Sequence, residues 1–523
     1  MISNGYDDEH RQHGSGEPGL KVGGALRVGA TVALVFAIVW FAVVLTWQAG
    51  DASPTALDLG LYLLLLPLVL LGGLWLLRGA IRRRREARAG KQPSVGTDVA
   101  GSPLERGGPQ PDRVIHLHAS ALWLRAGASA AAVAEALASP QRPPLHPRLR
   151  DSLGLPVFAA AVDDLDPAAV EGALRLAVDD PDTVGRLFGE ERLRAIALLD
   201  QVAEELLLAA LPPPPDPAVA LAVPGLHPHA LHHSRSSRAP APAAASPVLR
   251  VHVLLPASWP AETRQASADW LSAKARAIGF DDGQFSIEVV AVAAADAAWQ
   301  LIDRLAQARH DGEHDRHLLL ATHSLIGSAS IDRLDAAREL LVSGHPEGLI
   351  PGEGAAGLLL GGADATAQSG SSPLRVHRML HGPAGRGRGA SRQAGELLQH
   401  AMTTAAQPAE TIVAVFSDAD HRPSRAIEIA GAIAATLPEL EPVDDARHLG
   451  LACGDLGAVA PLAVLAAAAA HAAQADAPVL VFGLADPHAR TALALSPVPP
   501  VDVESDAVSP NSAEAASAVA TAA

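Results

Sequence analysis

Two uncharged apolar segments near the start of the chain restrict its folding more than any other feature. Residues 28–47, VGATVALVFAIVWFAVVLTW, and residues 59–77, LGLYLLLLPLVLLGGLWLL, contain no Asp, Glu, Lys or Arg. A helix of twenty residues is about 30 Å long, which matches the hydrocarbon core of a bilayer. We therefore predict two transmembrane helices within residues 28–77. A cleaved signal peptide and a buried soluble hairpin are the alternatives.

The charges around these segments predict their orientation. The connecting loop, residues 48–58, carries Asp51 and Asp58 but no Lys or Arg, whereas Arg82–Arg85 follow the second segment. Because positive residues stay on the cytoplasmic side, we expect a two-pass protein with both termini cytoplasmic. Arg82–Arg85 would then face anionic headgroups, at about 1 kcal/mol per arginine. An excess of Arg over Lys and abundant Ala are typical of a GC-rich bacterium, so we expect the bacterial inner membrane.

Composition excludes several classes of protein. The net charge is −17, and there is no G-x-x-x-x-G-K-[ST] motif and no interleaving of aromatic and basic residues, so no nucleic-acid partner is expected. Cys453 is the only cysteine, so the chain cannot form an intrachain disulfide framework, which fits a reducing compartment. No motif for a cofactor is present.

The chain divides into six segments. Periodicity and Pro/Gly content predict a cytoplasmic tail, a membrane hairpin, a basic juxtamembrane segment with a linker, an α/β region and a disordered tail, and the family resemblance given below implies two halves within the α/β region. The first half contains a Pro/His-rich insertion at 212–247. The segments are 1–27, 28–77, 78–112, 113–345, 346–495 and 496–523.

The soluble part alternates predicted strands with predicted helices. Strands are predicted at 155–165, 248–256, 285–292, 317–324 and 478–486, and a long amphipathic helix at 189–211. Strands separated by helices of ten or more residues favour parallel βαβ units.

The segment GLIPGEGAAGLLL, residues 348–360, resembles the G-F-V-x-G-E-G-A-x-x-L-V-L strand of β-ketoacyl synthases. Gly352 and Gly354 would allow close backbone approach, and Ala355 and Ala356 would let a strand pack beneath another layer. The order of strands and helices over residues 248–486 is also similar. The resemblance implies a thiolase-like α-β-α-β-α layered sandwich of two similar halves, and a homodimer.

The resemblance also implies which positions should carry the chemistry. Members of the family use a cysteine nucleophile and two histidines, or a histidine and an asparagine. At the nucleophile position this chain has Ala293, Ala294, Ala295 and Asp296. The first histidine position holds Asp418, with His421 three residues later, and the second holds either Gly454 or Asp455. We therefore assign no catalytic, cofactor-binding or metal-binding residue.

Four other features could carry chemistry, and each has a plainer explanation. Cys453, at the start of a predicted helix, is either a relocated nucleophile or a small buried residue. Thr322-His323-Ser324 shows no acid or oxyanion pocket to complete a catalytic pair. The two histidine clusters are either metal ligands or solvated loops: His227, His229, His232 and His233; and His310, His314 and His317 with Asp311, Glu313 and Asp315.

The sequence therefore favours a membrane-anchored pseudoenzyme of the thiolase-like superfamily. Such a protein would act as a cytoplasmic binding or adaptor module for a protein partner. The alternatives are a divergent acyltransferase or condensing enzyme that acts on acyl thioesters, and a lipid-responsive scaffold driven by Arg82–Arg85.

Overall fold

The computed structural model of the chain describes residues 113–178, 180–212, 248–311, 315–363, 373–385 and 387–498. The predicted transmembrane segments, Arg82–Arg85, the histidines of the 212–247 insertion and almost all of the predicted tail lie outside these residues. Among the described residues, no helix combines the length and apolarity needed to cross a membrane.

Five strands form the sheet of the first half of the described chain. β7 lies between β1 and β6 and runs antiparallel to both, whereas β4 runs parallel to β5 and β6. If the five strands are numbered by their order along the chain, they lie side by side in the sheet in the order third, second, fourth, fifth, first. The strands are β1 (Ile115–Leu124), β4 (Leu249–Pro256), β5 (Phe285–Val292), β6 (Arg316–Ser324) and β7 (Glu353–Gly361).

The second half repeats this strand order. β13 is antiparallel to β12 and β8, whereas β10 is parallel to β11 and β12. β8 also pairs with β1, so a single 11-stranded sheet runs through both halves, with β9 (Leu380–Pro383) added beside β13. The protein is thus a mixed α/β fold built on one large sheet. The strands are β8 (Leu374–Val376), β10 (Val415–Ser417), β11 (Ala446–His448), β12 (Val479–Gly483) and β13 (Ala489–Pro497).

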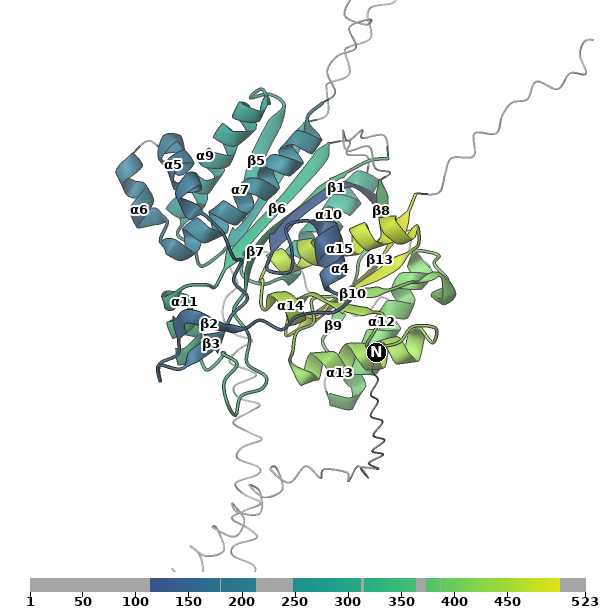
Figure 1. The fold of residues 1–523 in the computed structure, drawn as a ribbon. Helices are drawn as coiled ribbons and strands as arrows, with labels where there is room; N and C mark the ends of the chain where they lie inside the picture. Colours follow the sequence, from purple (N-terminus) through teal and green to yellow (C-terminus); the bar gives the residue numbers. More distant parts are fainter. Residues whose placement is uncertain are drawn as a thin grey trace, which may run out of the picture. The chain divides into compact units, whose positions relative to one another are not determined.

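Three hydrophobic cores alternate with the two halves of the sheet (Figure 1). The largest core joins the inner faces of both halves to the middle helices: α4 (Ala130–Ala136), α10 (Asp296–His310) and α15 (Val459–Ala475). The outer face of the first half packs against α5 (Pro167–Ala177), α7 (Glu190–Ala210) and α9 (Ala261–Ile278). The outer face of the second half packs against α12 (Ala390–Thr404) and α13 (Pro423–Thr436).

Alanine makes the middle layer thin. α15 reads VAPLAVLAAAAAHAAQA and is buried around most of its circumference because it has one half of the large sheet on each side. Large side chains on such a helix would push the two halves of the sheet apart. The scarcity of aromatic residues, 3% of the chain, is consistent with this packing.

Local sequence signals predict most of these elements. Ser129 caps α4 by accepting a hydrogen bond from Ala132 N, and the predicted amphipathic helix at 189–211 is α7. The predicted strand at 155–165 is mostly wrong, because only β3 (Pro156–Phe158) forms there, paired with β2 (Leu145–Arg150). Beyond β3 the backbone forms isolated hydrogen bonds in place of a strand ladder. Ala160 N donates to Pro351 O, and Val162 N donates to the Glu353 side chain.

The position of β7 bears on the division of the chain into halves. The expected division at residues 345 and 346 falls before β7, but β7 pairs with β1 and β6. The strand order therefore groups β7 with the first half.

Three shorter helices connect the main elements: α6 (Val184–Leu187), α11 (Ser328–Ala336) and α14 (Leu449–Cys453).

Candidate functional site

Glu353, the acid of the Gly-Glu-Gly motif, is fully buried and fully engaged. Its carboxylate pairs with Arg194 of α7, accepts a hydrogen bond from Ser324 Oγ at 2.9 Å, and accepts another from Val162 N at 2.8 Å. Arg194 also donates to Val162 O at 3.0 Å. Glu353 therefore joins β7, β6, α7 and the segment after β3. This use is structural.

Of the glycines beside Glu353, Gly352 lets the two halves of the domain meet, and Gly354 makes room for Leu124 of β1. A Cβ on Gly352 would lie 2.2 Å from Cys453 O, and a Cβ on Gly354 would lie 2.2 Å from Leu124 Cδ2. Gly454 has a φ of 65°, and a Cβ there would lie 2.6 Å from Ile350 O. Asp455 N donates to Ile350 O at 2.8 Å. The motif of the first half thus interlocks with the loop between α14 and α15.

The structure brings Asp418 and the Gly454–Asp455 pair, both expected from the resemblance, to one small cavity. Asp418 follows β10 directly, at the carboxyl end of parallel strands, where polar sites of α/β proteins form. Its Oδ1 accepts a hydrogen bond from Leu484 N at 2.5 Å, and its buried Oδ2 has no hydrogen-bond partner. Burial raises the pKa of Asp418, although the bond from Leu484 and the charge of Arg425 oppose this.

Asp420 forms ion pairs with two arginines that line the same cavity. Arg422 donates to both of its carboxylate oxygens, and Arg425 Nη1 lies 3.6 Å from Oδ2. Burial alone would raise the pKa of Asp420, but the bond from Arg422 and both arginine charges hold it below its usual value. Arg425 also donates to Ala485 O at 2.8 Å.

We call Asp418, Asp420, Arg422, Arg425 and Asp455 the Asp/Arg site. The cavity that they line has a volume of about 20 Å³, enough for one water molecule. The Asp455 carboxylate is hydrogen-bonded within its own loop, because its Oδ1 accepts a hydrogen bond from Gly457 N at 2.9 Å. A fixed ionic network with this little space can hold a water molecule, but it leaves no room for an acyl chain.

The third expected position lies at the start of α10 and carries no thiol. Asp296 is the first residue of that helix, after three alanines. Burial raises the pKa of Asp296, with His381 lowering it and Asp486 raising it further. Asp486 follows Ala485, which lines the Asp/Arg site, so this position is close to the same region.

Cys453 is wholly buried at the end of α14. Burial raises the pKa of its thiol to about 12, despite a backbone hydrogen bond from Ala126 and the charge of Arg125. A thiol must lose its proton to act as a nucleophile. The geometry therefore favours a packing role for Cys453.

The other residues that the sequence suggested as candidates for catalysis or metal binding either hold the core together or lie apart from one another. Ser324 bonds to Glu353, and Thr322 donates to Ala195 O at 2.6 Å. His310 ends α10, and His317 lies on β6 beside His252, with their facing ring nitrogens 3.3 Å apart. His314 and Glu313 lie outside the described residues. Within the described ranges, no three His, Cys, Asp or Glu side chains are grouped closely enough to hold a metal ion.

Sequence reasoning missed the arginines of the Asp/Arg site and a serine–histidine contact. Charged residues directly after a buried strand, as in SDADHRPSR, are the signal that could have identified Arg422 and Arg425. Ser417 Oγ lies 2.8 Å from His448 Nδ1, and burial lowers the pKa of His448 to about 4. Ser417 is fully buried, so a substrate could not reach its hydroxyl.

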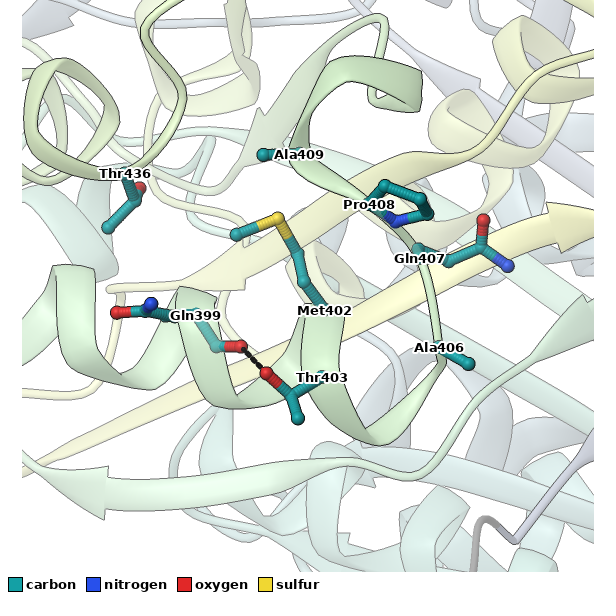
Figure 2. A pocket seen from close by; sticks show the side chains of 8 residues that line it. All are labelled: Gln399, Met402, Thr403, Ala406, Gln407, Pro408, Ala409 and Thr436. Carbon is teal, nitrogen blue, oxygen red and sulfur yellow. Dashed lines mark hydrogen bonds between the residues drawn. The ribbon is translucent and has the colours of Figure 1, made fainter.

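Among the described residues, the surface pockets that are larger than this cavity include the following two. One, of about 290 Å³, holds His421 and Arg142 among apolar residues. The other, of about 380 Å³, lies on the outer helices α12 and α13 (Figure 2). Thr403 Oγ1 donates to Gln399 O there at 2.8 Å. No acidic or basic side chain lines this second pocket, so it offers no acid–base chemistry.

The structural neighbours of this chain are ketosynthase and ketosynthase/chain length factor domains. The ishigamide ketosynthase/chain length factor has a TM-score of 0.46 and 13% identity, over 74% of this chain and 100% of that chain. A ketosynthase from module 6 of the bacillaene synthase from Bacillus subtilis 168 has a TM-score of 0.49 and 12% identity, over 74% and 72%. The oxazolomycin ketosynthase domain OzmH KS7 from Streptomyces albus JA3453 has a TM-score of 0.47 and 13% identity, over 74% and 75%. No protein-family model and no curated protein matches the sequence.

Proposed function

We propose that this chain is a thiolase-like pseudoenzyme that binds a partner at a membrane and does not condense acyl groups. The repeated strand order and the three alternating cores support the five-layer α-β-α-β-α sandwich. The Gly-Glu-Gly motif supports descent from the ketosynthase branch. Residues 28–77 anchor the chain in the bacterial inner membrane, with both termini in the cytoplasm.

The proposed absence of condensing activity rests on one observation. The expected histidine positions hold an ionic network around a cavity of about 20 Å³. Ketosynthase chemistry needs a thiolate that accepts the acyl group and neutral donors that stabilise the developing oxyanion. Asp418 and Asp455 put carboxyl groups in place of those donors, and an ionised carboxylate there would repel both the substrate carboxylate and the oxyanion.

Acyl transfer gives the direct test. The full chain in detergent is incubated with acetyl- and malonyl-thioesters, and its intact mass is measured. We expect no covalent adduct, because the Cys453 thiol is buried and protonated. An acyl adduct that disappears in Cys453→Ala would establish the divergent acyltransferase instead.

Thiol labelling tests the same point without a substrate. At pH 8 the native protein should take up no iodoacetamide at Cys453, whereas the protein unfolded in urea should take up one equivalent. Rapid labelling of the native protein would show an accessible thiolate and contradict the packing role.

A further inference from the structure

The hairpin formed by β2 and β3 carries an amphipathic patch that its own fold does not use. Leu145, Leu153 and Leu155 are 49%, 81% and 58% exposed. Arg148 and Arg150 lie on the same hairpin, and the Arg148 side chain is 75% exposed. We call these five residues the Leu/Arg hairpin. In Figure 1 it lies at the edge of the molecule, beside α11.

The exposure of these leucines does not come from a loosely held segment. Val157 and Leu149, on the same hairpin, pack into a small core with residues of α11. Asp151 Oδ1 accepts from Leu153 N and Leu155 N at 3.0 and 2.8 Å, and Gly154 turns the tip with a φ of 78°. Ser152 N donates to Asp335 at 2.8 Å. The fold therefore holds the tip out as a fixed protrusion.

The charges on the hairpin indicate an anionic surface as its target. Arg142 stacks over the Phe158 ring at 4.6 Å, so a third cation lies at the base of the hairpin. Two of the nearby acids already accept hydrogen bonds from the turn, Asp151 from Leu155 N and Asp335 from Ser152 N, and Glu190 lies 3.5 Å from Arg148. A convex apolar tip flanked by arginines matches a lipid surface, which needs no complementary cavity.

The length of the preceding chain places such a surface within reach. If residues 28–77 span a membrane, 35 residues (78–112) lead to the first described residue. Whatever its conformation, a chain of 35 residues spans at most about 115–125 Å. A bilayer that held residues 28–77 would thus be within this reach of the first described residue.

We propose that the Leu/Arg hairpin docks on the anionic lipid bilayer and inserts Leu153 and Leu155 below the headgroups. This proposal rests on the membrane anchoring proposed above. Docking would hold one face of the domain against the membrane and leave the opposite face for a protein partner.

Site-specific fluorescence tests this docking in the full chain. Leu153→Cys is labelled with an environment-sensitive fluorophore; Cys453 stays unlabelled because it is buried. The control label is at Leu176→Cys, on α5, where the leucine is 90% exposed. In vesicles of phosphatidylcholine with phosphatidylglycerol, the probe at residue 153 should shift to the blue and be quenched by lipid-borne nitroxides. The probe at residue 176 should show neither change.

Charge reversal separates docking from chance proximity. The double variant Arg148→Glu/Arg150→Glu, carrying the same label, should lower the ratio of docked to free hairpin at least about tenfold. Pure phosphatidylcholine vesicles should reproduce this loss. Equal quenching at residues 153 and 176, or no change in the double variant, would overturn the proposal.

A carbonate wash distinguishes this result from failure of the anchor. If the chain washes off vesicles at alkaline pH, the anchoring proposal is wrong. The labelled chain is then added to preformed vesicles, where a blue shift still supports docking and its absence overturns it. A probe shielded only in native membranes, and not in pure lipid, would identify a protein as the occupant and overturn the lipid proposal.

Discussion

At the scale of single residues, small groups and buried charges hold the elements of the domain together. Glu353 and Arg194 form a pair whose remaining oxygens and hydrogens are used by Ser324 and Val162. Breaking a buried pair on one side leaves the other charge unpaired, which costs more than the pair contributes. The same residues that suggest an enzyme from the sequence therefore act as structural connectors.

Glu353→Gln should lower the free energy of unfolding by about 2–4 kcal/mol, because Arg194 would lose its counter-charge inside the domain. Urea denaturation followed by circular dichroism measures the change. Glu171→Gln is the matched control, since Glu171 pairs with Arg175 on the exposed surface of α5 and should change stability by less than about 0.5 kcal/mol. Similar effects for the two variants would contradict the structural role of Glu353.

Gly352→Ala should destabilise the protein strongly, because its Cβ would lie 2.2 Å from Cys453 O, a backbone atom that cannot easily move. Gly172→Ala, in the interior of α5, meets nothing within 4 Å and should stabilise by up to about 1 kcal/mol. Thermal midpoints of the two variants should therefore shift in opposite directions. A Gly352→Ala protein as stable as the parent would show that the two halves do not interlock there.

At the scale of elements, periodicity predicts which segments form helices but not how the charged loops meet. The amphipathic pattern of α7 and the Ser129 cap of α4 are readable because each depends on neighbours in the chain. The contact between Asp418 and Leu484 joins residues 66 positions apart, and the Gly352 packing depends on Cys453. Such partners are set by the strand order, which a single sequence does not display. The apolar run at 155–165 does not form the predicted strand for the same reason, because its backbone bonds go to the distant glycine motif.

Neighbouring strands β4, β5 and β6 hold a row of polar groups: His317, His252 and Glu288. Burial, followed by His252 and Arg250, lowers the pKa of His317 to about 4, while Asp315 opposes this. His252 Nδ1 lies 3.0 Å from Glu288 Oε2. The unfolded chain takes up protons near pH 6.5, whereas the folded chain resists protonation of His317 down to about pH 4. Stability should therefore fall as the pH decreases from 6.5 to 4 and should not depend on His317 above that window.

The variant His317→Leu isolates this contribution. Its unfolding free energy should depend less steeply on pH between 6.5 and 4, by up to about 1.4 kcal/mol per pH unit. Comparison with the parent cancels the contributions of other groups, Asp418 included. Parallel pH profiles for the two proteins would show that His317 titrates normally in the folded state.

At the scale of the whole molecule, the two halves share one core and should unfold together. α15 contacts strands of both halves, and the inner faces of both belong to a single hydrophobic cluster. The described tryptophans are Trp123, Trp259, Trp270 and Trp299, all in the first half. The fluorescence of Trp123, Trp259 and Trp270 therefore reports on the first half, whereas Trp299 also lies against Gly483 of the second half.

Ala463→Leu, in the buried part of α15, should overpack the central layer and destabilise the protein by about 1–3 kcal/mol or more. The midpoint measured by tryptophan fluorescence should fall with that measured by circular dichroism. Ala473→Leu, on the exposed side of α15, should change both by less than about 0.5 kcal/mol. A fluorescence midpoint unchanged in Ala463→Leu would mean that the halves unfold independently.

The place where β1 begins determines how the domain would bear load. Tension along the polypeptide from residue 112 would enter at Ile115, in a strand hydrogen-bonded on one side to β7 and on the other to β8. Pulling on such an internal strand requires shearing two ladders at once, whereas an edge strand can be peeled away bond by bond. A force applied at the amino end of the domain therefore acts on a strand inside the sheet. Because β1 pairs with β7 of the first half and with β8 of the second, both halves resist that force.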